Sequence, residues 1–397
     1  MTIQQIPSKG ATILSFASIL EDQVIEQVQE LAQMNFISPH LALMPDAHGG
    51  KGSSVGTVIP TKRAVIPAAV GVDIGCGMIA ARTQFTKSDI DGKDLKELRL
   101  NVESVIPLSA GNYNEPGSWK DREHTQLRVM ELENIAKREE VSLLHSPMWR
   151  EQLGSLGSGN HFIEACFDQD DVVWLFLHSG SRGVGNKIAK RHIKIAQDLC
   201  KIWHIELSNP DLAYLPQGTR EFTQYIRELH WAQKFALLNR AEMMDRFITE
   251  FENWIGTPVL EAERINCHHN YTVPTKIFGH DVWLTRKGAI DATKGTRGVI
   301  PGSMGTRSYV VTGKGDTAGL NSAPHGAGRA MSRTKAKATF TPEDLEKAMV
   351  GIEHRSGDQF LDEHPGAYKD IDVVMEDAKS LVTVTHELRQ FLNVKGD

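Results

Sequence analysis

Segments typical of strands and of helices are interspersed along this chain, without the regular strand–helix–strand alternation that builds a doubly wound parallel sheet. This irregular order predicts an α+β fold. The 397 residues would suffice for two or three domains of ordinary size, or for one large mixed domain. Since no internal repeat, low-complexity tract or obvious linker divides the chain, these patterns predict the fold class but leave the number of domains open.

Helices are predicted for segments whose apolar residues recur at helical spacing. The sequence Ser18-Ile19-Leu20-Glu21 has the form of a capping box and marks the start of the first helix. Thr341 followed by Pro342 marks the start of a later one. The predicted helices cover residues 19–34, 126–140, 184–203, 219–254, 342–355 and 379–392.

Strands are predicted where β-branched and apolar runs are bounded by turn residues. The glycine-rich segment 44–78 indicates short strands and tight loops. Residues 161–167 and 172–178, joined by an acidic turn, predict a hairpin whose second strand is apolar enough to be covered on both faces. Further strands are predicted at 265–267, 282–285 and 309–312, and an exposed loop at 109–121.

The charge of the chain is unevenly distributed. The formal net charge of −6 gives no global basic surface of the kind typical of nucleic-acid binding proteins. Residues 286–337, however, carry ten Lys or Arg and two Asp, a net charge of +8 that leaves −14 for the rest. Glycines are interleaved with these charges, which suits phosphate binding, whereas a solvated surface without a special partner is the alternative.

The four cysteines are far apart, form no C-x-x-C motif and follow no signal peptide. A disulfide framework is therefore not expected, and a reducing, cytoplasmic location is predicted. No apolar run reaches the roughly 18 residues needed to span a bilayer, so no membrane association is predicted.

Several metal-ligating residue types occur at predicted turns and strand ends. Asp73 and Cys76 lie three apart, with glycines flanking the cysteine, so a tight turn can bring both onto one ion; a buried, inert cysteine is the alternative. His161 and His178 occupy neighbouring ends of the predicted hairpin, and the pair 268–269 follows another strand. Together these residues predict a metal cluster. A thiolate with imidazoles suits Zn²⁺ or Fe²⁺ better than Mn²⁺ or Mg²⁺, which leaves the ion open.

The segment 322–333 contains a further candidate site. His325 follows a proline and precedes two glycines, whose backbone N–H groups can approach an anion closely. Arg329 and Arg333, four apart, would share one face of a helix beginning there and could hold phosphate oxygens. An imidazole beside a metal and phosphate-binding donors is placed to attack phosphorus and form a covalent nucleotidyl intermediate. A histidine that only binds phosphate is the alternative.

Taken in order, a series of motifs resembles the RtcB family of RNA-splicing ligases, and the similarity spans nearly the whole chain. The resemblance implies one compact α+β domain over residues 1–397, with mixed sheets flanked by helices and a deep metal-containing cleft. It also implies a GTP- and Mn²⁺-dependent enzyme that joins an RNA 3′-phosphate, or a 2′,3′-cyclic phosphate after opening, to a 5′-hydroxyl end. The motifs are MPDAHGGKG, GVDIGCGM, LGSLGSGNHFIE, LHSGSRGVGN, CHHNY, TRKGA, IPGSMG, HGAGRAMSR and the closing VKG.

The resemblance further implies roles for individual residues. His325 would be the residue that accepts GMP, and Asp46 would orient it. Cys76 would bridge two Mn²⁺ ions, one completed by Asp73 and His161, the other by His178 and His269. GTP would contact Asn160, Glu164, Ser303, Gly326, Ala327, Gly328 and, through the base, Lys395; the RNA and its terminal phosphates would contact Arg182, Lys287, Arg329 and Arg333.

In the implied reaction, His325 attacks the α-phosphorus of GTP and pyrophosphate leaves. GMP then passes to the RNA 3′-phosphate, and the 5′-hydroxyl displaces it. The basic segment 286–337 would bring sequence-independent backbone contacts to one cleft. Two other functions remain to be distinguished: a metal-dependent phosphoesterase acting on RNA ends, and a non-catalytic RNA-binding protein.

Overall fold

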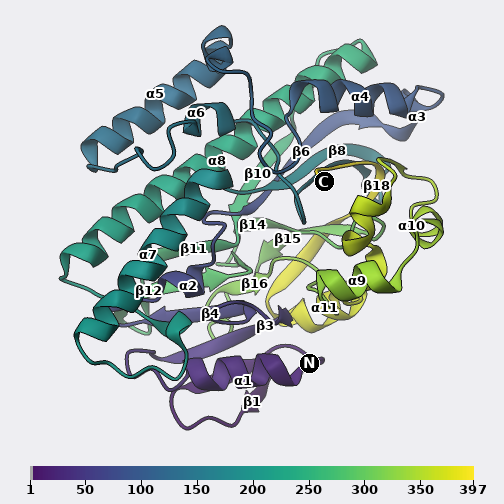
Figure 1. Ribbon diagram of the computed structural model, residues 1–397. Helices are drawn as coiled ribbons and strands as arrows, with labels where there is room; N and C mark the ends of the chain where they lie inside the picture. The colour runs from purple at the N-terminus through teal and green to yellow at the C-terminus, as the bar shows by residue number, and fades with distance from the viewer. Residues whose placement is uncertain (1–2) are drawn as a thin grey trace.

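Two mixed β-sheets form the centre of the structure, a computed structural model that describes residues 3–397 (Figure 1). In spatial order, the first sheet contains β1 (Gln4–Ile6), β2 (Thr12–Ser15), β3 (His40–His48), β4 (Val55–Thr61), β12 (His280–Lys287) and β11 (Asn270–Ile277). The second contains β10 (Glu263–His268), β6 (Gly77–Thr86), β8 (Val172–Ser179), β7 (Phe162–Phe167), β18 (Val382–Lys395), β15 (Ser308–Gly313) and β14 (Arg297–Ile300), and β17 (Glu353–His354) pairs with β18.

Two short pairs complete the strands: β13 (Ala289–Asp291) with β16 (Ser322–Pro324), and β5 (Ala64–Val65) with β9 (Leu215–Pro216). The helices flank the sheets and confirm the predicted α+β class. They are α1 (Asp22–Leu31), α2 (Pro67–Val70), α3 (Lys87–Ile90), α4 (Leu95–Val105), α5 (Glu123–Arg138), α6 (Trp149–Gln152), α7 (Arg182–Ile202), α8 (Arg220–Ile255), α9 (Arg333–Thr339), α10 (Pro342–Ala348) and α11 (Ile371–Asp377). Short 3₁₀ turns lie at Ser118–Asp121, Pro210–Leu212, Asp358–Glu363, Pro365–Ala367 and Ala378–Ser380.

The long helix α8 covers one face of the second sheet, where it contacts β6, β8 and β10, and α4, α5 and α7 pack against it (Figure 1). Alternate residues of β8 therefore enter two cores. Leu175 and Leu177 pack on the α8 side with Phe247, while Trp174 and Phe176 join the core between the sheets. All four β8 side chains are fully buried, which confirms that this strand is covered on both faces.

Most predicted elements are confirmed, with small shifts at their ends. The hairpin forms as antiparallel β7 and β8, with Phe162 opposite His178. The helices predicted at 184–203 and 219–254 are α7 and α8, and Thr219 caps α8 by accepting a hydrogen bond from the N–H of Phe222. The expected capping box at 18–21 is wrong, because Glu21 precedes α1 and the N–H of Ser18 donates instead to Asp377.

Two predictions near the C-terminus are wrong. The helix expected at 379–392 is instead mostly strand β18, which pairs with β15 over residues 382–388 and with β7 over residues 389–395. These two ladders outweigh the helical spacing of its apolar residues. The helix expected over 342–355 ends at Ala348; Gly351 adopts a positive φ of 85°, and residues 353–354 pair with β18.

Within residues 3–397, no helix combines the length and the apolar character that crossing a bilayer requires.

Candidate metal centre and nucleotide site

Strand pairing brings the predicted metal ligands together at one end of neighbouring strands in the second sheet. Gly77, at the start of β6, pairs with Ser179 at the end of β8 on one side and with His268 at the end of β10 on the other. His178 lies opposite Phe162, the first residue of β7, so the preceding residue, His161, is also at this end of the strands. The N–H of His269 donates to the carbonyl of Cys76 at 2.8 Å, which ties the histidine segment to the cysteine turn.

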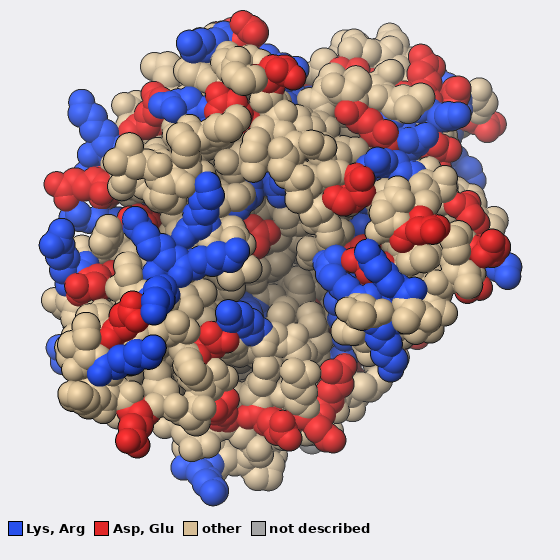
Figure 2. Space-filling model, in the orientation of Figure 1, with Lys and Arg blue, Asp and Glu red and all other residues tan. Residues whose placement is uncertain are grey.

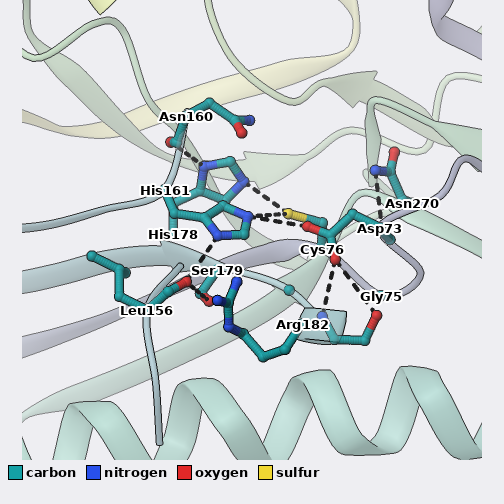
Figure 3. A network of polar contacts seen from close by, with 12 residues as sticks. Asp73, Gly75, Cys76, Leu156, Asn160, His161, His178, Ser179, Arg182 and Asn270 are labelled. Carbon is teal, nitrogen blue, oxygen red and sulfur yellow. Dashed lines mark hydrogen bonds and ion pairs between the residues drawn. The ribbon is translucent and has the colours of Figure 1, made fainter. Parts of the chain in front are cut away.

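The ligand atoms form two overlapping sets that share Cys76. In the first, Nε2 of His161 lies 3.0 Å from Oδ2 of Asp73 and 3.4 Å from Sγ of Cys76 (Figure 3). In the second, Sγ lies 3.2 Å from Nε2 of His178, which is 2.9 Å from Nε2 of His269. The thiol and the three imidazoles are buried. Donor atoms this close, from far apart in sequence, are typical of a metal site.

Backbone carbonyls orient two of the imidazoles toward the shared thiol. Nδ1 of His161 lies 2.9 Å from the carbonyl oxygen of Leu156, and Nδ1 of His178 lies 3.0 Å from that of Asn160 (Figure 3). Since a carbonyl only accepts, each Nδ1 carries the hydrogen and each Nε2 presents a lone pair to the cluster. Metal-bound histidines are commonly oriented in this way.

The protonation of the cluster also suits a cation. Burial lowers the pKa of His178 well below its usual range, so this imidazole is neutral and able to donate a lone pair. Burial, reinforced by the charge of Asp73, raises the pKa of the Cys76 thiol. Burial also opposes ionisation of Asp73, but the contacts with His161 and Cys76 and the charge of Arg182 together outweigh it and lower the pKa of Asp73 to about 2. A metal ion would favour the thiolate by replacing its proton.

Arg240 of α8 braces the two turns that carry the ligands, and nothing in the sequence pattern singled it out. Its side chain is fully buried. Nη1 donates to the carbonyls of Gly75 at 2.8 Å and Ser179 at 3.0 Å, and Nε donates to Oδ1 of Asn266 at 2.8 Å. The guanidinium thus joins β6, β8 and β10 beneath the cluster.

Arg240→Met is expected to lower the free energy of unfolding by about 3 kcal/mol, because the carbonyls of Gly75 and Ser179 and the half-buried Oδ1 of Asn266 lose this donor. Urea denaturation measures this change. Arg227 lies on the same helix but pairs with Glu140 at the surface, so Arg227→Met should cost no more than about 0.5 kcal/mol. Equal losses for the two variants would show that Arg240 is not a brace.

His325 lies between the ligand cluster and a buried acid. Its Nδ1 is 2.6 Å from Oδ2 of Asp46, and that oxygen also accepts the backbone N–H groups of His325 at 3.0 Å and Gly326 at 3.2 Å. The ring centroids of His325 and His269 are 4.6 Å apart. Gly328 lets the loop that carries His325 lie close to Asp46: at the φ of 73° that Gly328 adopts, a Cβ atom would lie 2.3 Å from the carbonyl oxygen of Asp46.

The comparison with known proteins assigns the chain to one family. A family model described as tRNA-splicing ligase RtcB matches residues 27–396. The chain belongs to the RtcB family. It is 44% identical over 389 residues to RNA-splicing ligase RtcB of Escherichia coli (strain K12), covering 95% of each chain. It is 30% identical over 437 residues to tRNA-splicing ligase RtcB of Pyrobaculum aerophilum, covering 93% of this chain and 90% of the other.

Two cavities of this RtcB chain share Asn160 and His325 in their linings. Both belong to the hollowed face in Figure 2. Lys and Arg side chains gather on the α7 and α9 sides of the hollow. The first cavity contains the metal-cluster side of His325. The second lies toward β18 and α9. Beyond the shared pair, the first is lined by His48, Lys51, Val55, Ala68, Gly71, Val72, Asp73, Cys76, Ile193, His269, Asn270 and Lys287, and the second by Phe162, His178, Pro301, Gly302, Ser303, Met304, Gly326, Ala327, Glu363, Tyr368 and Lys395.

Most residues that the RtcB resemblance assigned to GTP line the second cavity: Asn160, Ser303, Gly326, Ala327 and Lys395. Glu164 and Gly328 do not line it. Glu164 is buried deeper on the same face of β7 as Phe162, where its Oε1 accepts a hydrogen bond from Asn393 at 2.7 Å. Burial raises the pKa of Glu164 to about 8. Oε2 is buried and has no partner among the described residues.

The arginines assigned to phosphates converge, but not on a helix face. The expected shared helix is wrong, because Ser332 caps α9 and Arg329 precedes it. Both side chains instead reach Oε1 of Glu363, Arg329 at 3.3 Å and Arg333 at 3.0 Å. Lys395 lies 3.3 Å from the other oxygen of Glu363. This buried acid was missed by sequence reasoning, since no motif marks it.

Arg182 and Lys287 are held by protein groups. Nε of Arg182 donates to Oγ of Ser155 at 3.2 Å. Figure 3 shows Arg182 beside the cluster. Nζ of Lys287 donates to the carbonyls of Ser53 at 2.8 Å, Ala68 at 3.4 Å and Lys51. Burial lowers the pKa of Lys287 to about 7. Because three carbonyls occupy its amino group, Lys287 holds the loop at 51–53 that borders the first cavity.

Proposed function

We propose that this RtcB chain is a GTP- and Mn²⁺-dependent RNA ligase that joins an RNA 3′-phosphate, or a 2′,3′-cyclic phosphate, to a 5′-hydroxyl end through a GMP adduct of His325. The observation that carries the proposal is the position of His325, which contacts Asp46 through Nδ1 and lies beside His269 of the ligand cluster. A simple phosphate-binding histidine would need neither neighbour. The names of the relatives, RNA-splicing ligase and tRNA-splicing ligase, support the choice of RNA as substrate.

Asp73, Cys76 and His161 would hold one ion, and Cys76, His178 and His269 the other. The fit rests on the donor chemistry: two imidazoles present lone pairs to one thiol, and a carboxylate adjoins them. When bound, the ions would neutralise phosphate charge and favour attack at phosphorus. This donor set by itself suits Zn²⁺ better, and the choice of Mn²⁺ follows the family resemblance.

The chain's own residues would prepare His325 for nucleophilic attack. With Nδ1 directed at Asp46, the free lone pair is on Nε2, the atom that would attack the α-phosphorus while pyrophosphate leaves. Ala327, Asn160 and Ser303, whose hydroxyl lies 2.9 Å from that of Thr306, line the second cavity and are proposed to bind the nucleotide through polar groups. Lys395 and Glu164 are proposed to contact the base. Gly328 is proposed to let the loop that carries His325 lie close to Asp46. Arg182, Arg329 and Arg333 are proposed to bind the phosphates.

GMP would then move from Nε2 of His325 to the RNA 3′-phosphate, and the 5′-hydroxyl would displace it. Because His325 belongs to both cavities, we place the nucleotide in the second and the RNA ends in the first. On the α7 side, Lys187, Lys190 and Lys194 are exposed, and they would contact RNA phosphates without regard to sequence. Lys287 would act by holding the cavity loop.

The test uses RNA strands with defined ends, incubated with GTP and Mn²⁺. Product is expected from a 3′-phosphate or a 2′,3′-cyclic phosphate with a 5′-hydroxyl partner, and none from a 3′-hydroxyl. Phosphate release without joining or any need for GTP would instead indicate a phosphoesterase. RNA binding without any reaction would indicate a non-catalytic role.

Asp46→Asn is expected to slow GMP transfer to His325 about 100-fold, because the amide cannot stabilise the positive charge that His325 gains on attacking GTP. Radiolabelled GTP measures the rate. Asp281, paired with Lys276 at the surface, provides a control: Asp281→Asn should stay within about twofold, as expected for an exposed pair. An unchanged rate for Asp46→Asn would remove Asp46 from the proposed reaction.

A further inference from the structure

A second imidazole, His48, borders the first cavity beside His325. It ends strand β3, within the MPDAHGGKG motif, and is none of the proposed metal ligands. The two rings are stacked, with centroids 6.3 Å apart and planes inclined by 24°. Both residues line the cavity in which the RNA ends are proposed to meet.

Asp46 orients His48 as well as His325, through a different oxygen. Nδ1 of His48 lies 2.9 Å from the main-chain carbonyl oxygen of Asp46. Because that oxygen only accepts, Nδ1 carries the hydrogen and the lone pair is on Nε2. Nε2 makes no hydrogen bond within residues 3–397. One residue thus sets the tautomer of one ring by its backbone and contacts the other by its carboxylate.

The backbone around His48 is braced from two sides. Nζ of Lys369 donates to the carbonyl of Ala47 at 2.6 Å. On the other side, the side-chain amide of Gln27 in α1 binds both backbone groups of Gly50: its nitrogen donates to the carbonyl at 2.6 Å and its oxygen accepts the N–H at 3.2 Å. A general base needs such a fixed position relative to the proton it takes.

Burial keeps the imidazole of His48 neutral. Burial lowers the pKa of His48 to about 4; the charges of His325 and Lys369 act in the same direction, and the Asp46 carbonyl and carboxylate oppose them. At neutral pH the ring is therefore in the form that accepts a proton.

The other titratable side chains of the first cavity already have assignments. Asp73, Cys76 and His269 are proposed metal ligands, and His325 is the proposed GMP carrier. Lys287 binds backbone carbonyls, and Lys51 extends into solvent 3.8 Å from Asp211. Among the residues that line the cavity, His48 is left as the oriented acceptor.

We propose that His48 is the general base of the sealing step, with Nε2 accepting the proton of the RNA 5′-hydroxyl. As that proton transfers, the oxygen's electron pair forms the bond to the 3′-phosphorus. The bond from phosphorus to GMP breaks, its electron pair leaves with GMP, and the imidazolium then releases the proton to solvent. This inference rests on the proposed function, because it requires GMP-activated RNA in the first cavity.

The test compares two replacements and measures two steps. In His48→Asn, the amide nitrogen can take the place of Nδ1 and donate to Asp46, but no group replaces Nε2; in His48→Ala, both are lost. The first step measured is GMP labelling of His325 without RNA. The second is single-turnover sealing of RNA whose 3′-phosphate already carries GMP.

We expect His48→Asn to label within about threefold of wild type but to seal about 100-fold more slowly, the usual contribution of a general base. Normal sealing by His48→Asn would overturn the inference, as would equal slowing of both steps, which indicates a structural role. His280→Asn, at an exposed histidine of β12, should leave both steps unchanged. Failure of the wild type to take label would instead overturn the proposed function.

Discussion

His325→Ala is expected to take up no GMP label and to lower ligation of 3′-phosphate RNA about 10⁴-fold or more. The substitution removes the imidazole that lies against the Asp46 carboxylate and beside the ligand cluster. The label on the wild type should be acid-labile and alkali-stable, as expected for a phosphorus–nitrogen bond. Gel electrophoresis with radiolabelled GTP and labelled RNA measures the two activities.

A control separates loss of the nucleophile from loss of the site. RNA that already carries GMP on its 3′-phosphate does not need His325 as a carrier. His325→Ala should therefore seal this RNA within about tenfold of wild type, as expected when only the earlier step needs the missing group. If His325→Ala still acquired label from GTP, the carrier would be another residue and the proposed mechanism would be wrong.

Cys76→Ala is expected to weaken Mn²⁺ binding at least about 100-fold and to lower ligation about 10³-fold. The thiol belongs to both ligand sets, lying 3.4 Å from Nε2 of His161 and 3.2 Å from Nε2 of His178. Its loss would therefore affect both ions, whereas His161→Ala or His269→Ala should weaken mainly one. Calorimetric titration of the metal-free protein measures affinity and stoichiometry.

Cys200 provides the matched control for this experiment. It is also a buried thiol, but it lies near the end of α7, away from the ligand sets. Cys200→Ala should bind Mn²⁺ and ligate RNA as the wild type does, even where packing loss lowers its unfolding temperature. Unchanged Mn²⁺ binding by Cys76→Ala would show that the thiol bridges no metal.

The net charge counted along a segment of the sequence differs from the charge that the segment leaves uncompensated in the folded protein. Residues 286–337 carry a net +8 along the chain, yet many of their basic groups face acids from other segments. Arg297 pairs with Glu263 at 2.7 Å, Arg307 with Glu387 at 3.0 Å, and Arg333 with Asp362 at 2.8 Å. This segment is therefore not a free basic surface, because its charges are compensated by tertiary contacts that no local count includes.

Local patterns were sufficient for much of the fold. The periodicity of α7 and α8 and the β7–β8 hairpin depend on neighbouring residues, and each was predicted from them. The same reasoning failed for residues 382–395, where a helical pattern forms strand β18. There the deciding hydrogen bonds come from β7 and β15, which are remote in sequence.

The sequence by itself determined the family and the identity of the candidate ligands, because glycine-flanked Asp, Cys and His motifs retain a local chemical signature. Only the tertiary structure decided how they meet: a thiol common to two ligand sets, Arg240 beneath them, and one aspartate that orients two imidazoles through different oxygens. The physical reason is that ligand and hydrogen-bond geometry needs placement within a few tenths of an ångström. Packing between distant segments sets that precision.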